Sequence, residues 1–333
     1  LIHIPLTWAK MLLEQTHDWG YSCEPEPSVN NREIECARGK VIGGSSSVNA
    51  MAYVRGNRGD YDRWAASGLP DWSYKHVLPY FKKLETWEGR DPYRGASGPI
   101  NVQHCQYADP LVDAYGEAGL SGGFGWTDDY NGNIQEGFSR LQMTIKKGRR
   151  CSAASAYLRP ALSRKNLVVK VNALTTRVVF EKTRAVGIHY IQSNQASFAR
   201  ADQEVILCAG VVNTPQLLML SGVGNSQKLT NIGIKTKLGL DGVGLNLQDQ
   251  MSAIILYKRK GNGPFHHHMR ADRIASSLAR AYIFGTGFAS DVPGGMTAFL
   301  RTQSNYSLPN VQLLLTAAPL GAWPYLPPLK APF

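Results

Sequence analysis

Apolar and polar residues alternate most clearly between residues 166 and 210, a stretch that is also rich in β-branched residues. Five segments here are separated by turn residues, a pattern that predicts strands. They are NLVVKV (166–171), TTRVVFE (175–181), RAVGIHYIQ (184–192), ASFARA (196–201) and EVILCAG (204–210). In the following NTPQLLMLSGVG (213–224), Thr214 suits a helix N-cap and Pro215 the first helical position. The pattern therefore predicts a strand–loop–helix unit.

Helical spacing of apolar residues occurs in four other segments. The region 86–150, which surrounds the second of these segments, is rich in Gly, Asp, Asn and Pro and predicts long loops of the kind that often cover a site. Ser73 is the expected cap of the first helix, and Pro160 should kink or end the third. The helical segments are WSYKHVLPYFKKLE (72–85), DPLVDAYGEAG (109–119), SAASAYLRPALS (152–163) and RIASSLARAYIFGTG (273–287).

The length of 333 residues favours two domains. The net charge is +11, but the basic runs KKGRR (146–150) and KRK (258–260) are short and lack interleaved aromatic residues. This argues against a nucleic-acid platform and favours an anionic cofactor. No apolar run approaches the roughly 20 residues that span a bilayer. We therefore expect no transmembrane segment, and a cytoplasmic or peripherally membrane-associated protein.

The five cysteines form no CxxC pair and are odd in number, which predicts free thiols in a reducing compartment and no zinc site. The HHH cluster at 266–268 has no neighbouring carboxylate, and adjacent side chains converge on one ion only in a tight loop. We expect these histidines to lie in a solvated loop, with no metal.

The segment GGSSSVNAM (43–51) combines chain flexibility with helix capping. Gly43 and Gly44 have no Cβ, so the backbone can approach a flat or charged ligand. Ser45 or Ser46 can cap a helix whose N-terminus would seat a phosphate or a flavin oxygen. Asn49 would present a donor and an acceptor one turn further on. The segment alone is equally consistent with a glycine turn before a capped helix.

Several longer stretches of the sequence point to a specific protein family. RGKVIGGSSSVNAMAYVRGNRGDYDRW (38–64) resembles the first signature of the glucose–methanol–choline (GMC) flavin oxidoreductases, and GVVNTPQLLMLSGVG (210–224) resembles the second. DGVGLNLQDQ (241–250) is similar to the segment that follows in the family. YRGASGPINV (93–102), the stretch 128–167 and RAVGIHY (184–190) look like the choline dehydrogenase branch. The resemblance covers nearly the whole chain.

The resemblance implies an α/β fold in which a Rossmann-like FAD-binding domain is joined to a second, substrate-binding domain. Residues 1–62 and 152–250 would belong to the FAD-binding domain, and 63–151 and 251–333 to the loop or cap and substrate-binding domain. Asn246 and Asp249 would lie near the flavin. The residues implied in cofactor binding are Val41, Gly43, Gly44, Ser45, Asn49, Ala50, Met51, Ala52, Thr175, Ala209 and Gly210.

The sequence departs from the family pattern at several positions. Val48 stands where some relatives carry a histidine that attaches FAD covalently, so we expect non-covalent FAD. Val211 replaces a small residue, and Gln250 replaces a histidine. The family's GxGxxG unit and its C-terminal catalytic histidine motif are both missing. We therefore expect a fragment truncated at both ends, inactive by itself, and we assign no catalytic residue.

The implied activity is FAD-dependent oxidation of a primary alcohol to an aldehyde by hydride transfer to flavin N5. The electron acceptor could be oxygen, a quinone or another carrier, and the sequence does not set the oligomeric state. A choline-like cation would need an aromatic or carboxylate cage. Candidate aromatics are Trp87, Tyr93, Trp126 and Tyr130. There are two alternatives. The substrate is another alcohol, or the protein is an inactive homologue that acts as a binding module.

Overall fold

The computed structural model describes residues 1–319 and 321–326. The described chain forms two compact units, one made of residues 1–164 with the chain from 259 onward, the other of residues 165–258. We call them the first and second unit and describe each by itself. The segments 1–62 and 63–151, which the sequence assigns to different functional domains, lie together in the first unit.

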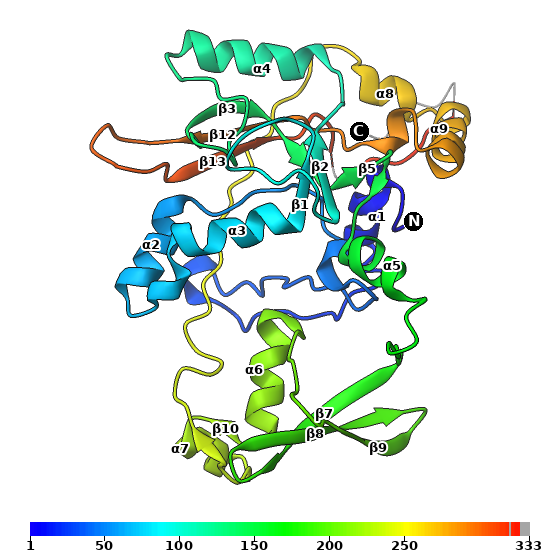
Figure 1. Ribbon diagram of the computed structural model, residues 1–333. Helices are drawn as coiled ribbons and strands as arrows, with labels where there is room; N and C mark the ends of the chain where they lie inside the picture. Colours follow the sequence, from blue (N-terminus) through cyan, green and yellow to red (C-terminus); the bar gives the residue numbers. More distant parts are fainter. Residues whose placement is uncertain (320, 327–333) are drawn as a thin grey trace. The chain divides into compact units, whose positions relative to one another are not determined.

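The first unit mixes short helices with short strands (Figure 1). Its α-helices are α1 (Trp8–Leu13), α2 (Arg58–Ala66), α3 (Tyr74–Leu84), α4 (Pro110–Ser121), α5 (Arg159–Ala161), α8 (Pro264–His268) and α9 (Ala271–Phe284). Its 3-10 and π turns are η1 (Pro5–Thr7), η2 (Pro27–Val29), η3 (Gly44–Ser47), η4 (Pro70–Trp72), the π-helical η5 (Ala154–Leu158) and η6 (Phe288–Ser290). Its strands are β1 (Glu85–Trp87), β2 (Ile100–His104), β3 (Gly137–Arg140), β4 (Gln142–Met143), β5 (Ile145–Lys146), β6 (Arg149–Arg150), β12 (Met296–Leu300) and β13 (Val311–Leu315).

Three small sheets organise these strands. One has the order β13-β12-β3, is antiparallel throughout, and places Met296 of β12 between Leu315 and Arg140. The second has the order β1-β2-β4, with β1 and β2 parallel and Glu85 opposite Ile100. The third is the hairpin of β5 and β6. The sheets bring residues near 85, 140 and 300 into one unit although they are far apart in sequence.

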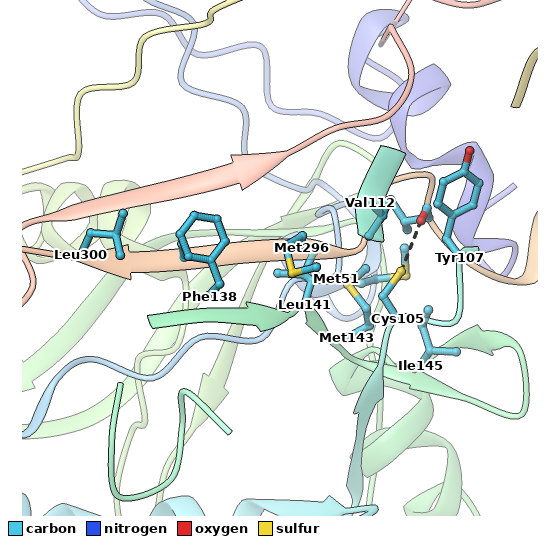
Figure 2. Close-up of a cluster of buried hydrophobic side chains, with 12 residues drawn as sticks. Met51, Cys105, Tyr107, Val112, Phe138, Leu141, Met143, Ile145, Met296 and Leu300 are labelled. Carbon is cyan, nitrogen blue, oxygen red and sulfur yellow. Dashed lines mark hydrogen bonds between the residues drawn. The ribbon is translucent and has the colours of Figure 1, made fainter. Parts of the chain in front are cut away.

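The main core of the first unit lies where these strands meet (Figure 2). Met51, Met143 and Ala298 have no exposed surface, and Met296 is 2% exposed. Figure 2 shows Cys105 in this cluster, where its thiol donates to the carbonyl of Val292 at 3.5 Å. Because Met51 belongs to this core, the chain just before it is anchored to the sheets.

The second unit is built on a three-stranded antiparallel meander of β7 (Ala173–Glu181), β8 (Arg184–Gln192) and β9 (Gln195–Arg200). The register of β7 on β8 shifts between Thr175 and Arg177, as at a β-bulge. Helix α6 (Gly210–Leu220) is tied to β7 at its C-terminal end, where Ser221 Oγ accepts from the Val178 amide at 2.8 Å. The remaining elements are β10 (Val223–Gly224), α7 (Ser226–Asn231) and β11 (Leu238–Gly239), with β10 and β11 parallel.

Two predicted strands are wrong. NLVVKV and EVILCAG carry no strand in the structure, and Val168 and Ile206 are 79% and 73% exposed. A strand is defined by hydrogen bonds to a neighbour, and these segments pair with no strand in the described chain. A β-rich composition shows that a segment can pair; it does not supply the partner.

Most other predicted elements are confirmed, with shifted ends. Strands β7, β8 and β9 and helices α3, α4 and α9 occupy the predicted segments. Helix α6 begins at Gly210, four residues before the predicted cap at Thr214, so Pro215 lies inside it. The histidines 266–268 lie on α8, which corrects the predicted loop.

All five cysteines are free thiols. Within residues 1–319 and 321–326, no helix has the length and apolar character needed to cross a bilayer.

Candidate cofactor-binding loop

The loop at residues 39–53 does not form the predicted helix. Gly43 and Gly44 both have left-handed backbone angles, with φ of 93° and 56°. The chain then makes only the four-residue 3-10 turn η3, bends at Asn49, passes through Met51 with a left-handed φ of 62°, and bridges Ala52 to Met143. So short a turn has almost no macrodipole, so the expected anion seat at a helix N-terminus is not built here.

The serine side chains explain why no helix forms. Ser46 Oγ donates to the Gly43 carbonyl at 2.6 Å, and Ser47 Oγ donates to the Ile42 carbonyl at 2.9 Å. Ser45 Oγ accepts from the Gly39 amide at 3.1 Å. Ser46 Oγ also accepts from the Ala153 amide at 2.9 Å. The serine hydroxyls are thus bonded to backbone groups outside residues 48–52 and do not cap a helix there, a competition to which short polar side chains are prone.

The side chain of Arg150 binds the loop through hydrogen bonds to its backbone and to Asn49. Its Nη1 donates to the Asn49 carbonyl at 2.6 Å, to Asn49 Oδ1 at 2.8 Å and to the Ser46 carbonyl at 3.3 Å, and its Nε donates to the Ile2 carbonyl at 2.9 Å. In an α-helix the Ser46 and Asn49 carbonyls would accept from residues four positions later. Arg150 takes both acceptors and so fixes the course of the loop after the turn.

The charge of Arg150 has no anionic partner. Its side chain is 3% exposed, it forms no ion pair within the described residues, and its Nη2 is buried without a hydrogen bond there. Burial lowers the pKa of Arg150 to about 10. An uncompensated buried cation with an orphaned donor fits a nearby ligand that carries negatively charged oxygens.

The three glycines of the loop have different surroundings. A Cβ at Gly39 would lie 2.6 Å from the Gly44 carbonyl oxygen, and one at Gly43 would collide with Ser47 Oγ. These two glycines therefore serve close packing within the loop. A Cβ at Gly44 would meet nothing within 4 Å. Gly44 is the glycine whose face is open to a ligand.

The eight predicted residues of the first unit differ in accessibility. Ser45, Asn49 and Ala52 are exposed, whereas Met51 has no exposed surface. Met51 can therefore contribute only by anchoring the loop in the core. The half-buried residues are Val41, Gly43, Gly44 and Ala50.

A buried ionic cluster fixes the chain immediately after the loop. Glu85 has no exposed surface and accepts from Arg55 Nη2 at 2.6 Å and from Arg94 Nε at 2.7 Å. Arg94 also donates to Asp129 Oδ1 at 2.6 Å, and the Arg55 amide donates to Asn131 Oδ1 at 2.7 Å. Burial by itself would raise the pKa of Glu85, but the hydrogen bond and charge of Arg94, with Arg55, outweigh it and lower that pKa.

The other three predicted cofactor residues lie in the second unit. Thr175 is half-buried on β7, beside the register shift, and pairs with Tyr190. Ala209 and Gly210 are exposed at the start of α6, where Gly210 has a φ of 90° and open space around a Cβ. The Ala209 amide donates to Thr214 Oγ1 at 3.1 Å, so Thr214 braces this turn from inside the helix.

Three residues with expected roles near the flavin are placed as follows. Asn246 is exposed with a left-handed φ of 59°, and the exposed Asp249 accepts from the Gln250 amide at 2.8 Å. Val48 is half-buried at the end of η3. Its aliphatic side chain has no group that could bond covalently to a flavin.

The four aromatic residues considered for a cation cage do not form one. The face of Trp87 is covered by Arg94, whose guanidinium carbon is 4.1 Å from the ring centroid, and Arg58 lies over Tyr93 at 5.5 Å. Tyr130 is 2% exposed and donates to the Tyr53 carbonyl. Trp126 alone is well exposed, at 42%.

Sequence reasoning missed Arg150 and the Glu85 cluster. Arg150 was visible only as the last residue of a basic run, and no local pattern separates it from its exposed neighbour Arg149. The signal for Glu85 is equally weak, because its partner Arg55 lies 30 positions away along the chain. Both roles depend on long-range contacts.

A family model for GMC oxidoreductases matches residues 23–252. The oxygen-dependent choline dehydrogenase of Sinorhizobium fredii is 47% identical over 314 residues, which cover 93% of this chain and 57% of that protein. Among solved structures, pyridoxine 4-oxidase from Mesorbium loti aligns with a TM-score of 0.67 and 32% identity over 72% of this chain and 47% of that one. Formate oxidase from Aspergillus oryzae aligns with a TM-score of 0.81 and 21% identity over 99% of this chain and 63% of that one.

The chain spans about half the length of the curated relatives that it matches, between 46% and 57% for the first three. The family match covers more than half of this chain, and the solved structures share its mixed helix and strand fold. The chain belongs to the GMC oxidoreductase family.

Proposed function

We propose that the protein takes part in FAD-dependent oxidation of a primary alcohol to an aldehyde. The observation that carries the proposal is the buried, uncompensated Arg150 behind a loop whose Gly44 faces open space. This arrangement supports binding of a flat, anionic cofactor next to the loop. Family membership makes FAD the specific candidate.

Bound FAD would supply the acceptor for the hydride that leaves the alcohol carbon. The residues of this chain would bind and orient that cofactor. Gly44 lets the backbone approach it, the exposed Ser45 and Asn49 offer polar atoms, and Arg150 provides positive charge close behind Asn49. We assign no residue of this chain as the catalytic base.

The proposed cofactor contacts also include residues that are not on the loop. Thr175, Ala209 and Gly210 are proposed from the family resemblance, and the open space at Gly210 supports its part. We retain residues 1–62 and 152–250 as the proposed FAD-binding domain, and 63–151 and 251–333 as the proposed cap and substrate-binding domain. The absence of a nucleophile at Val48 supports non-covalent binding.

Choline is the first substrate to test, because the relatives of high identity carry the name choline dehydrogenase. Two observations weigh against a cationic substrate. The chain carries a net charge of +11. Of the four candidate aromatic residues, Trp87 and Tyr93 are covered by arginines and Tyr130 is buried, so they do not form a cage with the exposed Trp126. Other primary alcohols therefore belong in the same assay. Oxygen, quinones and other carriers are the proposed acceptors.

The test uses the full-length gene product, purified with bound flavin and kept free of oxygen. Addition of choline should bleach the visible absorbance of the flavin, because the substrate reduces it. A flavin that choline leaves oxidised but another primary alcohol bleaches would keep the activity and remove choline as the substrate. A protein without flavin, or with flavin that no alcohol reduces, would overturn the proposed oxidation and favour a binding module.

A further inference from the structure

A cavity of about 690 Å³ lies in the first unit, lined by residues from the end of β2, helices α8 and α9, and the turn η6. It is within the roughly 300–1,000 Å³ range of small-molecule sites. No residue between 39 and 53 lines it. The proposed function therefore leaves this cavity without a role.

Two arginines of α9 give the cavity its charge. Arg273 and Arg280 both line it and are seven positions apart, so they lie on one face of the helix. Neither forms an ion pair within residues 1–319 and 321–326. The single acid of α9, Asp272, pairs with Arg270 at 2.6 Å. The wall thus presents two positive charges that the described protein does not neutralise.

Arg273 is already oriented by its neighbours. Its Nη1 donates to His267 Nδ1 at 2.6 Å and to the His267 carbonyl at 3.3 Å. Its Nε and Nη2 make no hydrogen bond in the described chain. A guanidinium that is held on one side and open on the other is arranged to bind a planar or tetrahedral oxyanion by two donors.

Asp291 and His268 also line the cavity, and neither offsets its positive charge. Asp291 is 7% exposed, and its oxygens accept from the amides of Gln106 and Val292, so its charge is engaged within the protein. Burial also raises the pKa of Asp291. Burial, together with the charges of His267 and Arg273, lowers the pKa of His268, which is stacked on Phe288. The positive charge of Arg273 therefore acts on His268 within the cavity wall.

Uncharged polar groups complete the wall. Ser276, Ser277 and Thr286 line the cavity, and the Ser276 hydroxyl donates to the Arg273 carbonyl at 2.9 Å. The amides of Thr286 and Gly287 donate no hydrogen bond within the described chain. Gly285 and Gly287 have φ of 66° and 93°. A Cβ at Gly285 would collide with the Lys147 carbonyl oxygen, whereas one at Gly287 would meet only Arg280, at 3.9 Å, so Gly287 is the glycine with open space around it. Such a turn allows a ligand to reach the backbone donors.

From this combination we propose that the cavity binds a small molecule through a carboxylate or phosphate group held by Arg273 and Arg280. The rest of the molecule would lie over Tyr107 and Phe288. The proposal is independent of FAD, because it uses none of the cofactor-loop residues.

The test is calorimetric titration of the full chain with inorganic phosphate, with succinate and with neutral glycerol, at constant ionic strength. Phosphate or succinate should bind in the millimolar range or tighter, and the stronger of the two identifies the preferred oxyanion. Arg273→Gln and Arg280→Gln should each weaken that binding about tenfold or more, since each removes a charge-assisted contact. Arg270→Gln removes an equal charge from the N-cap residue of α9, which does not line the cavity, so this variant should bind the anion within about twofold of the parent protein.

A second measurement uses the unmutated protein, so that it does not depend on whether the variants fold. The pKa of His268, followed by NMR, should rise when the oxyanion binds and should not respond to glycerol. No binding of either anion would overturn the proposal. Equal loss of binding in Arg270→Gln and Arg280→Gln, or a His268 pKa that ignores the bound anion, would do the same.

Discussion

The guanidinium of Arg150 holds both oxygens of Asn49, the carbonyl at 2.6 Å and the side-chain Oδ1 at 2.8 Å. A residue on the hairpin of β5 and β6 thereby sets the course of a loop that lies 101 positions earlier in the chain. The loop's geometry is a tertiary property, and it can be tested from the Arg150 side.

Arg150→Lys should loosen the loop, because an ammonium cannot reproduce the contacts that Nε and Nη1 make with Ile2, Ser46 and Asn49. We expect a loss of about 2 kcal/mol in the free energy of unfolding and about tenfold weaker FAD binding. Arg149→Lys is the matched control, since Arg149 is exposed. Urea unfolding and flavin titration measure both effects. Equal behaviour of the two variants would show that Arg150 does not hold the loop.

Gly44→Ala separates backbone strain from ligand contact. Gly44 has a φ of 56° with open space around a Cβ, and Gly20 has a φ of 72° with the same open surroundings. Both alanine variants should therefore lose about 1 kcal/mol of stability. Only Gly44→Ala should also weaken FAD binding, because its methyl group points to the proposed cofactor. If FAD binding does not distinguish the two variants, Gly44 does not face the cofactor.

Glu85→Gln should cost about 3–5 kcal/mol at neutral pH, because it leaves Arg55 and Arg94 buried with no carboxylate between them. Glu136→Gln, which breaks the partly exposed pair with Arg301, should cost less than about 1 kcal/mol. Urea unfolding of the two variants and the parent protein gives the comparison. Similar losses in both would mean that the cluster contributes no more than a surface pair.

The same carboxylate predicts a pH dependence. The folded state lowers the pKa of Glu85 below its value in the unfolded chain, so folding favours the ionised form. Its contribution is complete above the unfolded-state pKa and is lost as the pH falls through the lower folded-state pKa. The stability gap between the parent protein and Glu85→Gln should therefore shrink in acid, and a gap that stays constant would contradict this reading.

Because valine at position 48 cannot bond covalently to flavin, we expect acid denaturation to release the flavin. Its side chain has no nucleophilic or imidazole nitrogen atom with which to form a bond to the cofactor. After precipitation of the flavin-loaded protein with trichloroacetic acid, the yellow colour should remain in the supernatant. Flavin that stays with the washed pellet would mean a covalent bond through another residue.

The strands that the sequence predicts correctly are those whose partners are their neighbours. β7, β8 and β9 pair in chain order, with turns at Lys182 and at Ser193–Asn194 that adopt left-handed angles. Alternation and turn residues are local signals, and they suffice for a meander. The segments 166–171 and 204–210 are also apolar, but no strand of the part of the chain that the structure describes pairs with them, and there the prediction fails.

The candidate loop shows the same limit. Its glycines and serines mark a special backbone, and the left-handed Gly43 and Gly44 agree with that. Whether the serines cap a helix or bond backwards depends on Arg150 and on the anchoring of Met51 in the core. Neither contact leaves a pattern in residues 39–53. The motif could be located from the sequence, but its conformation could not be derived.

Because Cys105 is buried, the rate at which its thiol is labelled can report opening of the first unit. Cys105 and Cys151 are buried, whereas Cys23 and Cys208 are exposed. Burial, with the nearby charge of Asp291, raises the pKa of Cys105 and keeps it from forming the reactive thiolate. An alkylating reagent should therefore label the exposed pair at once and reach Cys105 only when the first unit opens. The rate of that slow labelling would measure how often its core is exposed, without any engineered probe.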